Sequence, residues 1–107
     1  MKRYGQIIGV KQEKLEEYKA YHAKVWPDVL DMIRQCNIRN YSIFHKDDVL
    51  YAYFEYFGDD FAADMAKMAA DPMTQKWWDI MNPMQTPVET RANGEWWANM
   101  EEVFHVD

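Results

Sequence analysis

A tyrosine and a histidine in the first third of the chain have the types and the spacing to exchange protons with a ligand. Tyr18 and His22 lie four residues apart in a run whose apolar positions recur every three or four residues, so both project from one face of a helix. An imidazole ionises near neutral pH and serves as acid or base in catalysis. A histidine in such a stripe can equally be a core residue with satisfied hydrogen bonds, and its position alone leaves both interpretations open.

Aromatic side chains elsewhere could form the walls of a cavity around His22. Tyr41 lies on a predicted strand from which it can face the helix, and Trp77 and Trp78 lie on a later helix. Adjacent helical residues point about 100° apart, so one indole can contact a ligand while the other packs in the core. Flat apolar faces with a few polar tips suit a sugar ring. We therefore predict an aromatic-walled cavity between helix and sheet.

Other titratable residues give weaker signals. Glu102 is the one carboxylate on an otherwise apolar side of the last predicted strand, which makes it a candidate second proton acceptor; a buried ion pair or an exposed edge is the alternative. No metal-binding spacing such as H-E-x-x-H or a cysteine pair is present. The remaining histidines and their acidic neighbours are therefore interpreted as solvated residues: His45, Asp47, Asp48, His105 and Asp107.

The elements that would position these residues follow from periodicity and from helix and turn signals. The predicted strands span residues 3–10, 38–45, 49–57 and 95–106, and the predicted helices span 11–36, 61–70 and 72–81. The first helix is expected to break near Val25 and Trp26 because Pro27 removes a backbone donor and restricts the residue before it. Residues 82–94 are predicted to form a long loop. The order β-α-β-β-α-β indicates one ferredoxin-like α+β domain over residues 1–107, with an antiparallel sheet and helices on one face.

The third predicted strand carries aromatic residues on both of its faces, whereas helices can cover only one. Tyr51 and Tyr53 alternate with Phe54 and Tyr56 along this strand. The uncovered face should therefore be buried against a partner, and the simplest partner is a second copy of the chain. We predict a homodimer with the two sheets packed face to face, a dimeric α+β barrel.

Composition excludes several classes of function. The chain has 107 residues, of which 49% are hydrophobic, and a net charge of −6. An acidic surface repels phosphate backbones, so general nucleic-acid binding is not expected. No run of apolar residues is long enough to span a membrane. The first residues lack the apolar core of a signal peptide, and the single cysteine, Cys36, is expected to be a small buried hydrophobe, so a cytoplasmic location is expected.

Four segments together resemble the L-rhamnose mutarotase family. Residues 17–27, Glu-Tyr-Lys-Ala-Tyr-His-Ala-Lys-Val-Trp-Pro, resemble the family motif E-Y-x-x-x-H-x-x-x-W-P. Residues 40–43 (Asn-Tyr-Ser-Ile), 75–78 (Gln-Lys-Trp-Trp) and 102–104 (Glu-Val-Phe) resemble its later blocks in the same order and at similar spacing. The resemblance extends over nearly the whole chain.

This resemblance implies a dimeric ferredoxin-like enzyme that interconverts the α and β anomers of a 6-deoxy-L-hexose, L-rhamnose or L-fucose, without a metal or other cofactor. It implies that His22 is the proton donor and that the substrate contacts are Tyr18, Tyr41, Trp77 and Trp78. The resulting hypothesis is that His22 protonates the ring oxygen while Glu102 or a water molecule takes the second proton. The alternatives are a cofactor-free oxygenase or haem-degrading enzyme of the same architecture, or a dimer module without catalytic activity.

Overall fold

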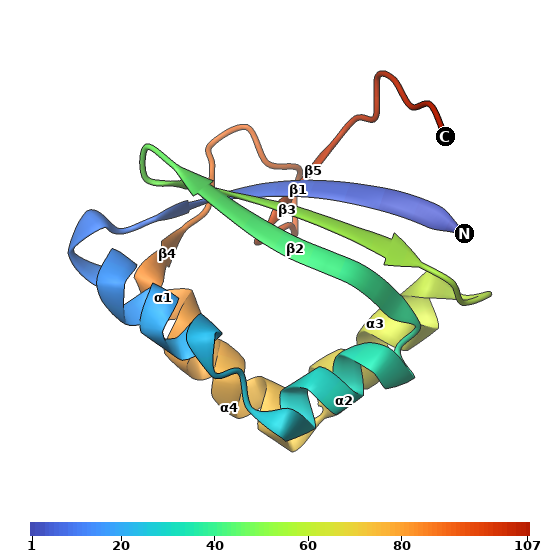
Figure 1. Ribbon diagram of the computed structural model, residues 1–107, viewed down its shortest axis with the longest axis horizontal. Helices are drawn as coiled ribbons and strands as arrows, with labels where there is room; N and C mark the ends of the chain where they lie inside the picture. Colours follow the sequence, from blue (N-terminus) through green and yellow to red (C-terminus); the bar gives the residue numbers. More distant parts are fainter.

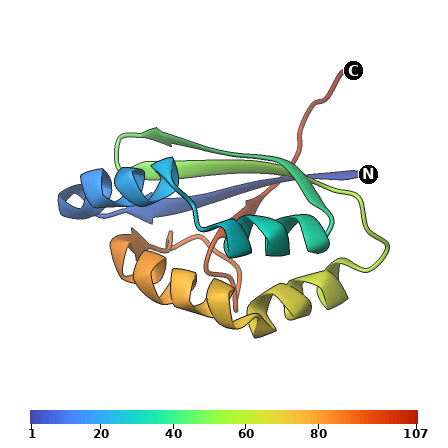
Figure 2. The ribbon, with the colours of Figure 1, turned by 60° about the horizontal axis from the view of Figure 1, so that its bottom comes forward.

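An antiparallel sheet forms one layer of the molecule, and helices cover one of its two faces (Figures 1 and 2). The computed structural model describes all residues, 1–107. The strands are β1 (Lys2–Val10), β2 (Ile38–Lys46), β3 (Val49–Tyr56), β4 (Gln85–Thr86) and β5 (Ala98–Met100). Their spatial order is β2-β3-β1, with β4 and β5 pairing with different parts of the free edge of β1.

The helical layer consists of two pairs of consecutive helices. They are α1 (Leu15–Ala23), α2 (Pro27–Gln35), α3 (Phe61–Ala70) and α4 (Pro72–Met81), with short 3-10 turns η1 (Gln12–Lys14) and η2 (Asn82–Met84). The order of strands and helix pairs confirms the predicted ferredoxin-like α+β class. None of these helices combines the length and the apolar composition needed to cross a membrane.

The predicted break in the first helical run is confirmed. Trp26 has an extended conformation with φ −58° and ψ 134°, and Pro27 is the first residue of α2. A residue before proline is pushed out of the helical region, and proline at the first helical position loses no hydrogen bond. The break lets α1 and α2 take different directions beneath the sheet (Figure 1).

The second helix pair begins and ends where the sequence predicts, at residues 61–70 and 72–81. Asp60 accepts a hydrogen bond from the backbone of Ala63, and Asp71 does the same from Thr74. An aspartate at this position satisfies a backbone donor that the helix itself leaves unpaired. The two caps therefore set where α3 and α4 begin, and through α4 they set the position of Trp77.

A β-bulge in β2 turns Tyr41 toward the helices. Asn40 and Tyr41 together oppose Phe54 on β3, because the register shifts between Arg39 and Ser42. Asn40 has φ 51°, and its side chain donates to Glu55 on the uncovered face. The extra residue reverses the alternation of sides along the strand. The Tyr41 ring consequently lies 5.5 Å from that of Phe54 on the helix-covered face.

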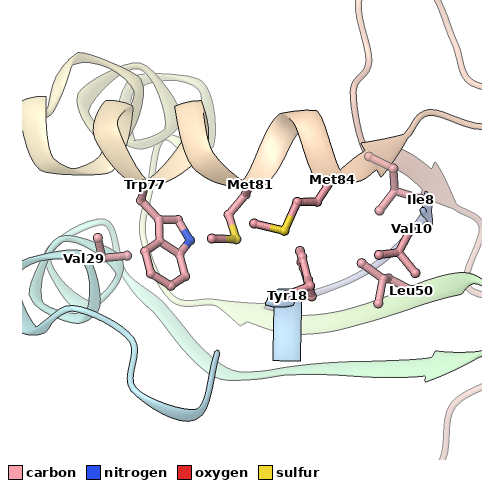
Figure 3. Packing of buried hydrophobic residues seen from close by; sticks show 8 residues of the cluster. All are labelled: Ile8, Val10, Tyr18, Val29, Leu50, Trp77, Met81 and Met84. Carbon is pink, nitrogen blue, oxygen red and sulfur yellow. The ribbon is translucent and has the colours of Figure 1, made fainter. Parts of the chain in front are cut away.

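The core lies between the sheet and the helices and contains two of the predicted site residues. Tyr18 from α1 and Trp77 from α4 are buried in the same cluster (Figure 3). The other members of this cluster are Ile8, Val10, Val29, Leu50, Met81 and Met84. Cys36 is fully buried, as predicted. The candidate site is therefore built directly on the core.

The prediction of a last strand over residues 95–106 is wrong at both ends. Only β5 is a strand, and the residues after it lack regular structure and extend away from the sheet (Figures 1 and 2). Gly5 pairs with Met100, so continuing this register would reach the start of β1 within a few residues. A strand needs a neighbour, and the residues beyond 103 would have no residue of β1 opposite them. The predicted loop 82–94, in turn, contains the short strand β4.

Candidate active site

His22 lies in the last turn of α1 and is half-buried. Its Nδ1 is 2.8 Å from the backbone oxygen of Tyr18. A carbonyl oxygen can only accept, so Nδ1 is the nitrogen that carries the hydrogen in the neutral ring. No side chain or backbone group of the protein pairs with Nε2. Nε2 is therefore the nitrogen at which this imidazole can take up or release a proton.

Two aromatic rings hold the imidazole. The Tyr18 ring stacks on it at 4.2 Å between centroids, and the Trp77 ring meets it edge-on at 5.4 Å. Trp77 is itself in edge contact with Trp26 at 5.1 Å. Burial lowers the pKa of His22, and its hydrogen bond to the Tyr18 carbonyl partly offsets this shift. At neutral pH the ring is therefore mainly uncharged and ready to exchange a proton.

Both candidate tyrosines keep their protons at physiological pH. Burial raises the pKa of Tyr18 to about 12, although the hydrogen bond from Gln85 acts in the opposite direction. The ring of Tyr41 is 40% exposed, yet desolvation of its hydroxyl end raises its pKa, and the proximity of Tyr18 raises it further. The two hydroxyl groups thus lie within electrostatic reach of one another. They can donate and accept hydrogen bonds but cannot act as bases.

The two neighbouring tryptophans on α4 lie in different surroundings. Trp77 is 6% exposed and packs against His22, whereas Trp78 is 37% exposed. Their separation follows from the angle between adjacent residues of a helix. Trp77 contacts the imidazole from the core side, and Trp78 keeps part of its side chain exposed to solvent.

Glu102, the candidate second proton acceptor, is not brought to His22. It forms an ion pair with Arg3, with Oε1 and Oε2 each 3.2 Å from guanidinium nitrogens. Arg3 pairs with Glu55, whose side chain lies on the uncovered face of the sheet. His22 packs beneath the opposite face. Glu102 thus forms an ion pair, as one alternative expected, but this pair is exposed and not buried.

Two cavities of the structure do not include His22 in their walls. One, of about 190 Å³, lies between α2 and the start of β2 and includes Tyr41 in its wall. The other, of about 380 Å³, is formed by loop residues between Glu89 and Gly94. His22 lies between the rings of Tyr18 and Trp77, and Tyr41 lies in the wall of the smaller cavity.

Two residues around Tyr18 were not anticipated from the sequence. Gln85 donates to the Tyr18 hydroxyl at 3.2 Å and accepts from the Trp96 indole at 2.8 Å. Gln85 lies in the segment predicted to be a loop. Its strand, β4, has only two residues, which is too short for a pattern of alternating side chains to show that Gln85 is buried. Only its position in the folded sheet reveals the contact.

A model of the family described as L-rhamnose mutarotase matches residues 3–106. The chain belongs to this family. L-rhamnose mutarotases from Oceanobacillus iheyensis and Bacillus subtilis are 32% and 33% identical to it, and each comparison covers both chains completely. The resemblance of the four sequence segments is thereby confirmed, and membership of the L-rhamnose mutarotase family makes the chain an isomerase.

Solved structures support the same architecture. L-rhamnose mutarotase from Formosa agariphila superposes with a TM-score of 0.78 at 23% identity, with complete coverage of both chains. Tetracenomycin F2 cyclase from Streptomyces glaucescens gives a TM-score of 0.75 at 15% identity and covers 100% of this chain and 98% of the cyclase. At these identities the likeness establishes the fold alone, which members of the L-rhamnose mutarotase family share with a polyketide cyclase.

Proposed function

We propose that this protein interconverts the α and β anomers of L-rhamnose by opening and reclosing the sugar ring. The observation that carries the proposal is the state of His22: Nδ1 is fixed on the Tyr18 carbonyl and Nε2 has no partner within the protein. Because no buried nitrogen is left without a partner, Nε2 is open to solvent or to a ligand. Relatives that match over their full length are L-rhamnose mutarotases, which supports this substrate.

The reaction needs two proton transfers and no redox step. The bond between the anomeric carbon and the ring oxygen breaks, the ring oxygen gains a proton, and the anomeric hydroxyl loses one to become a carbonyl. Protonated His22 gives the Nε2 proton to the ring oxygen. Because Glu102 lies on the other face of the sheet, water takes the second proton. Reclosure on the opposite face of the carbonyl reverses these steps and gives the other anomer.

The aromatic residues bind and orient the sugar. Tyr18 and Tyr41 remain neutral and form hydrogen bonds with sugar oxygens. Trp78 offers an exposed indole face on which the apolar C–H groups of a sugar can lie. Trp77 is committed to the core and to His22, so its contribution is to hold the imidazole and to limit its hydration.

The proposal is tested by measuring anomer exchange at equilibrium with NMR saturation transfer. The protein should accelerate exchange of L-rhamnose well above the rate in matched buffer. L-Fucose, another 6-deoxy-L-hexose, is measured in parallel, and slower exchange than with L-rhamnose is expected. Buffer rates for both sugars would overturn the proposed function, and faster exchange of L-fucose would reassign the substrate.

We further propose that a second copy covers the open face of the sheet. That face carries the exposed side chains of Phe44, Tyr51 and Met100, and the C-terminal residues Val103 and Phe104 are also exposed. Monomeric proteins rarely leave apolar groups of this extent in water. Light scattering should give twice the mass of one chain, and Phe44→Glu should halve it, whereas Lys19→Glu on the exposed surface of α1 should not. A monomeric mass for the unaltered protein would refute the dimer.

A further inference from the structure

Gln85 connects Tyr18 to the loop between β4 and β5. It is one of two buried polar residues in the molecule, 6% exposed, and its backbone is fixed opposite Val10 on β1. Its Oε1 accepts from Trp96 Nε1 at 2.8 Å, and its Nε2 donates to the Tyr18 hydroxyl at 3.2 Å. The amide thus has a partner at each end, one from the loop and one from the candidate active site.

The chemistry of Trp96 determines which way this amide points. An indole nitrogen can donate a hydrogen bond and cannot accept one. The oxygen of Gln85 must therefore face Trp96, and the NH₂ group must face Tyr18. Reversing the amide would place two donors against each other at the indole. Trp96 therefore also fixes the direction of the hydrogen bond between Gln85 and Tyr18, in which Gln85 is the donor.

The hydroxyl of Tyr18 is left with one unused hydrogen. Its oxygen receives the hydrogen bond from Gln85, and no group in the protein accepts the hydroxyl hydrogen. The Tyr18 ring is 4% exposed and stacks on His22, so the ring has little freedom to move. The hydroxyl hydrogen is therefore available to a ligand beside the imidazole.

We propose that Trp96 and Gln85 are positioning residues that hold Tyr18 as a hydrogen-bond donor to the sugar. This inference rests on the proposed function and adds to it the direction of one hydrogen bond, in which Tyr18 donates and the sugar accepts. The ring oxygen of a sugar can only accept, so it is recognised by a donor. If the amide pointed the other way, the Tyr18 hydrogen would bind Gln85 and the sugar would meet an acceptor.

The decisive variant is Gln85→Glu, which keeps the shape of the side chain and removes its ability to donate. Above its pKa the introduced carboxylate draws the Tyr18 hydrogen toward itself, and activity should fall about tenfold, the worth of one hydrogen bond. Burial raises the pKa of a carboxyl group. As the pH falls through that pKa, the protonated group can donate to Tyr18 again. The activity of the variant relative to the unaltered protein should therefore recover in acid.

Two further variants separate this role from simple support of the loop. Gln6→Glu is the matched control, because Gln6 also donates through its amide to a side chain, Asn99, and its relative activity should not depend on pH. Trp96→Phe removes the indole donor and keeps an aromatic ring. It should lower kcat/KM about threefold or more, because the Gln85 amide is then free to reverse.

A measurement without substrate tests the hydrogen bonds themselves. In ¹⁵N-labelled protein, the indole signal of Trp96 is identified by its disappearance in Trp96→Phe. This signal should move upfield in Gln85→Leu, where its acceptor is gone. An unchanged signal would overturn the proposed chain of hydrogen bonds from Trp96 through Gln85 to Tyr18. If the ratio of the activity of folded Gln85→Glu to that of the unaltered protein does not depend on pH, Gln85 and Trp96 have only a structural role. Buffer-level exchange by the unaltered protein, with the shift intact, would instead overturn the proposed function.

Discussion

Two buried tyrosines at different places in the molecule resemble each other in burial and in pKa but differ in hydrogen bonding. Tyr18 is 4% and Tyr56 is 5% exposed, and for both the pKa is raised to about 12, chiefly by desolvation. The Tyr56 hydroxyl donates to Asp64 at 2.5 Å and accepts from the backbone of Asp60 at 3.1 Å. The Tyr18 hydroxyl only accepts, from Gln85.

This difference distinguishes a structural tyrosine from one that can bind a ligand. Around Tyr56 the network is closed, because Asn37 also donates to Asp64 and the group joins β3 to α3. Around Tyr18 one hydrogen remains unpaired, next to an imidazole with an unpaired nitrogen. Burial and pKa shifts alone would rank the two sites as equal. The unused hydrogen-bonding capacity is what supports the surroundings of Tyr18 and His22 as the proposed active site.

The largest effect is expected from His22→Ala. If His22 supplies the proton to the ring oxygen, its loss should slow anomer exchange about 10²- to 10⁴-fold, the usual contribution of a positioned acid or base. His105→Ala is the matched control, because His105 interacts with its neighbour Asp107 and lies apart from the aromatic cluster. NMR saturation transfer on L-rhamnose measures both. Unreduced exchange by His22→Ala would assign the chemistry to another group.

Tyr18→Phe should have the next largest effect, because it removes the unpaired donor and keeps the ring that stacks on His22. The loss of one hydrogen bond to the sugar should lower kcat/KM about tenfold. The Gln85 NH₂ group also loses its acceptor, so stability should fall by about 1–3 kcal/mol. Activity is measured well below the unfolding temperature so that the two effects are separated.

Tyr56→Phe is the counterpart that sharpens the comparison. It opens the closed network, so thermal unfolding should occur at a lower temperature, because Asp64 and the Asp60 backbone lose their shared partner. The rate of anomer exchange by folded protein should stay the same. A similar loss of activity in the two tyrosine variants would show that hydrogen-bonding capacity does not separate the two sites.

Much of the fold could be predicted because its determinants are local. Pro27 breaks the first helix, and Asp60 and Asp71 cap the next two, so these boundaries follow from residues within a single turn. Side-chain orientation on β2 was harder to predict. A regular strand would turn Tyr41 away from the helices, and only the bulge at Asn40, with its φ of 51°, turns it inward.

The errors arose where contacts distant in sequence decide the outcome. The alternation of apolar residues after Met100 resembles a strand, yet none of these residues pairs with β1, and the register would leave the residues beyond 103 with no residue of β1 opposite them. Glu102 looked exceptional as a lone carboxylate, but its partner Arg3 is near the other end of the chain. Gln85 carried no local signal, because its burial depends on its pairing with β1 and on Trp96 in a later loop.

The pH dependence of activity tests whether His22 or Tyr18 is the group whose titration controls the reaction. The pKa of His22 is lowered from its ordinary value near 6.5 by desolvation. Because the protonated ring is the acid, kcat/KM should rise about tenfold for each unit of pH below about 8 and should level off below that lowered pKa. Tyr18→Phe should keep the same profile, because the pKa of Tyr18 lies near 12. A profile that instead declines on the acid side would make the neutral imidazole the active form and His22 a base.

The smallest effect concerns the closed network at Tyr56. Hydrogen bonds from Tyr56 and then Asn37 lower the pKa of Asp64 below its ordinary value of 3.8. A lowered pKa in the folded state stabilises the protein at pH values above the ordinary pKa, and this contribution is lost as the pH falls through the lowered value. The stability difference between the unaltered protein and Tyr56→Phe, measured by urea unfolding, should therefore be largest near neutral pH and shrink in acid. For Tyr18→Phe the difference should not change over this range, because the partner of Tyr18 is the uncharged amide of Gln85. Equal acid dependence of both differences would mean that the charge on Asp64 is not what distinguishes the two tyrosines.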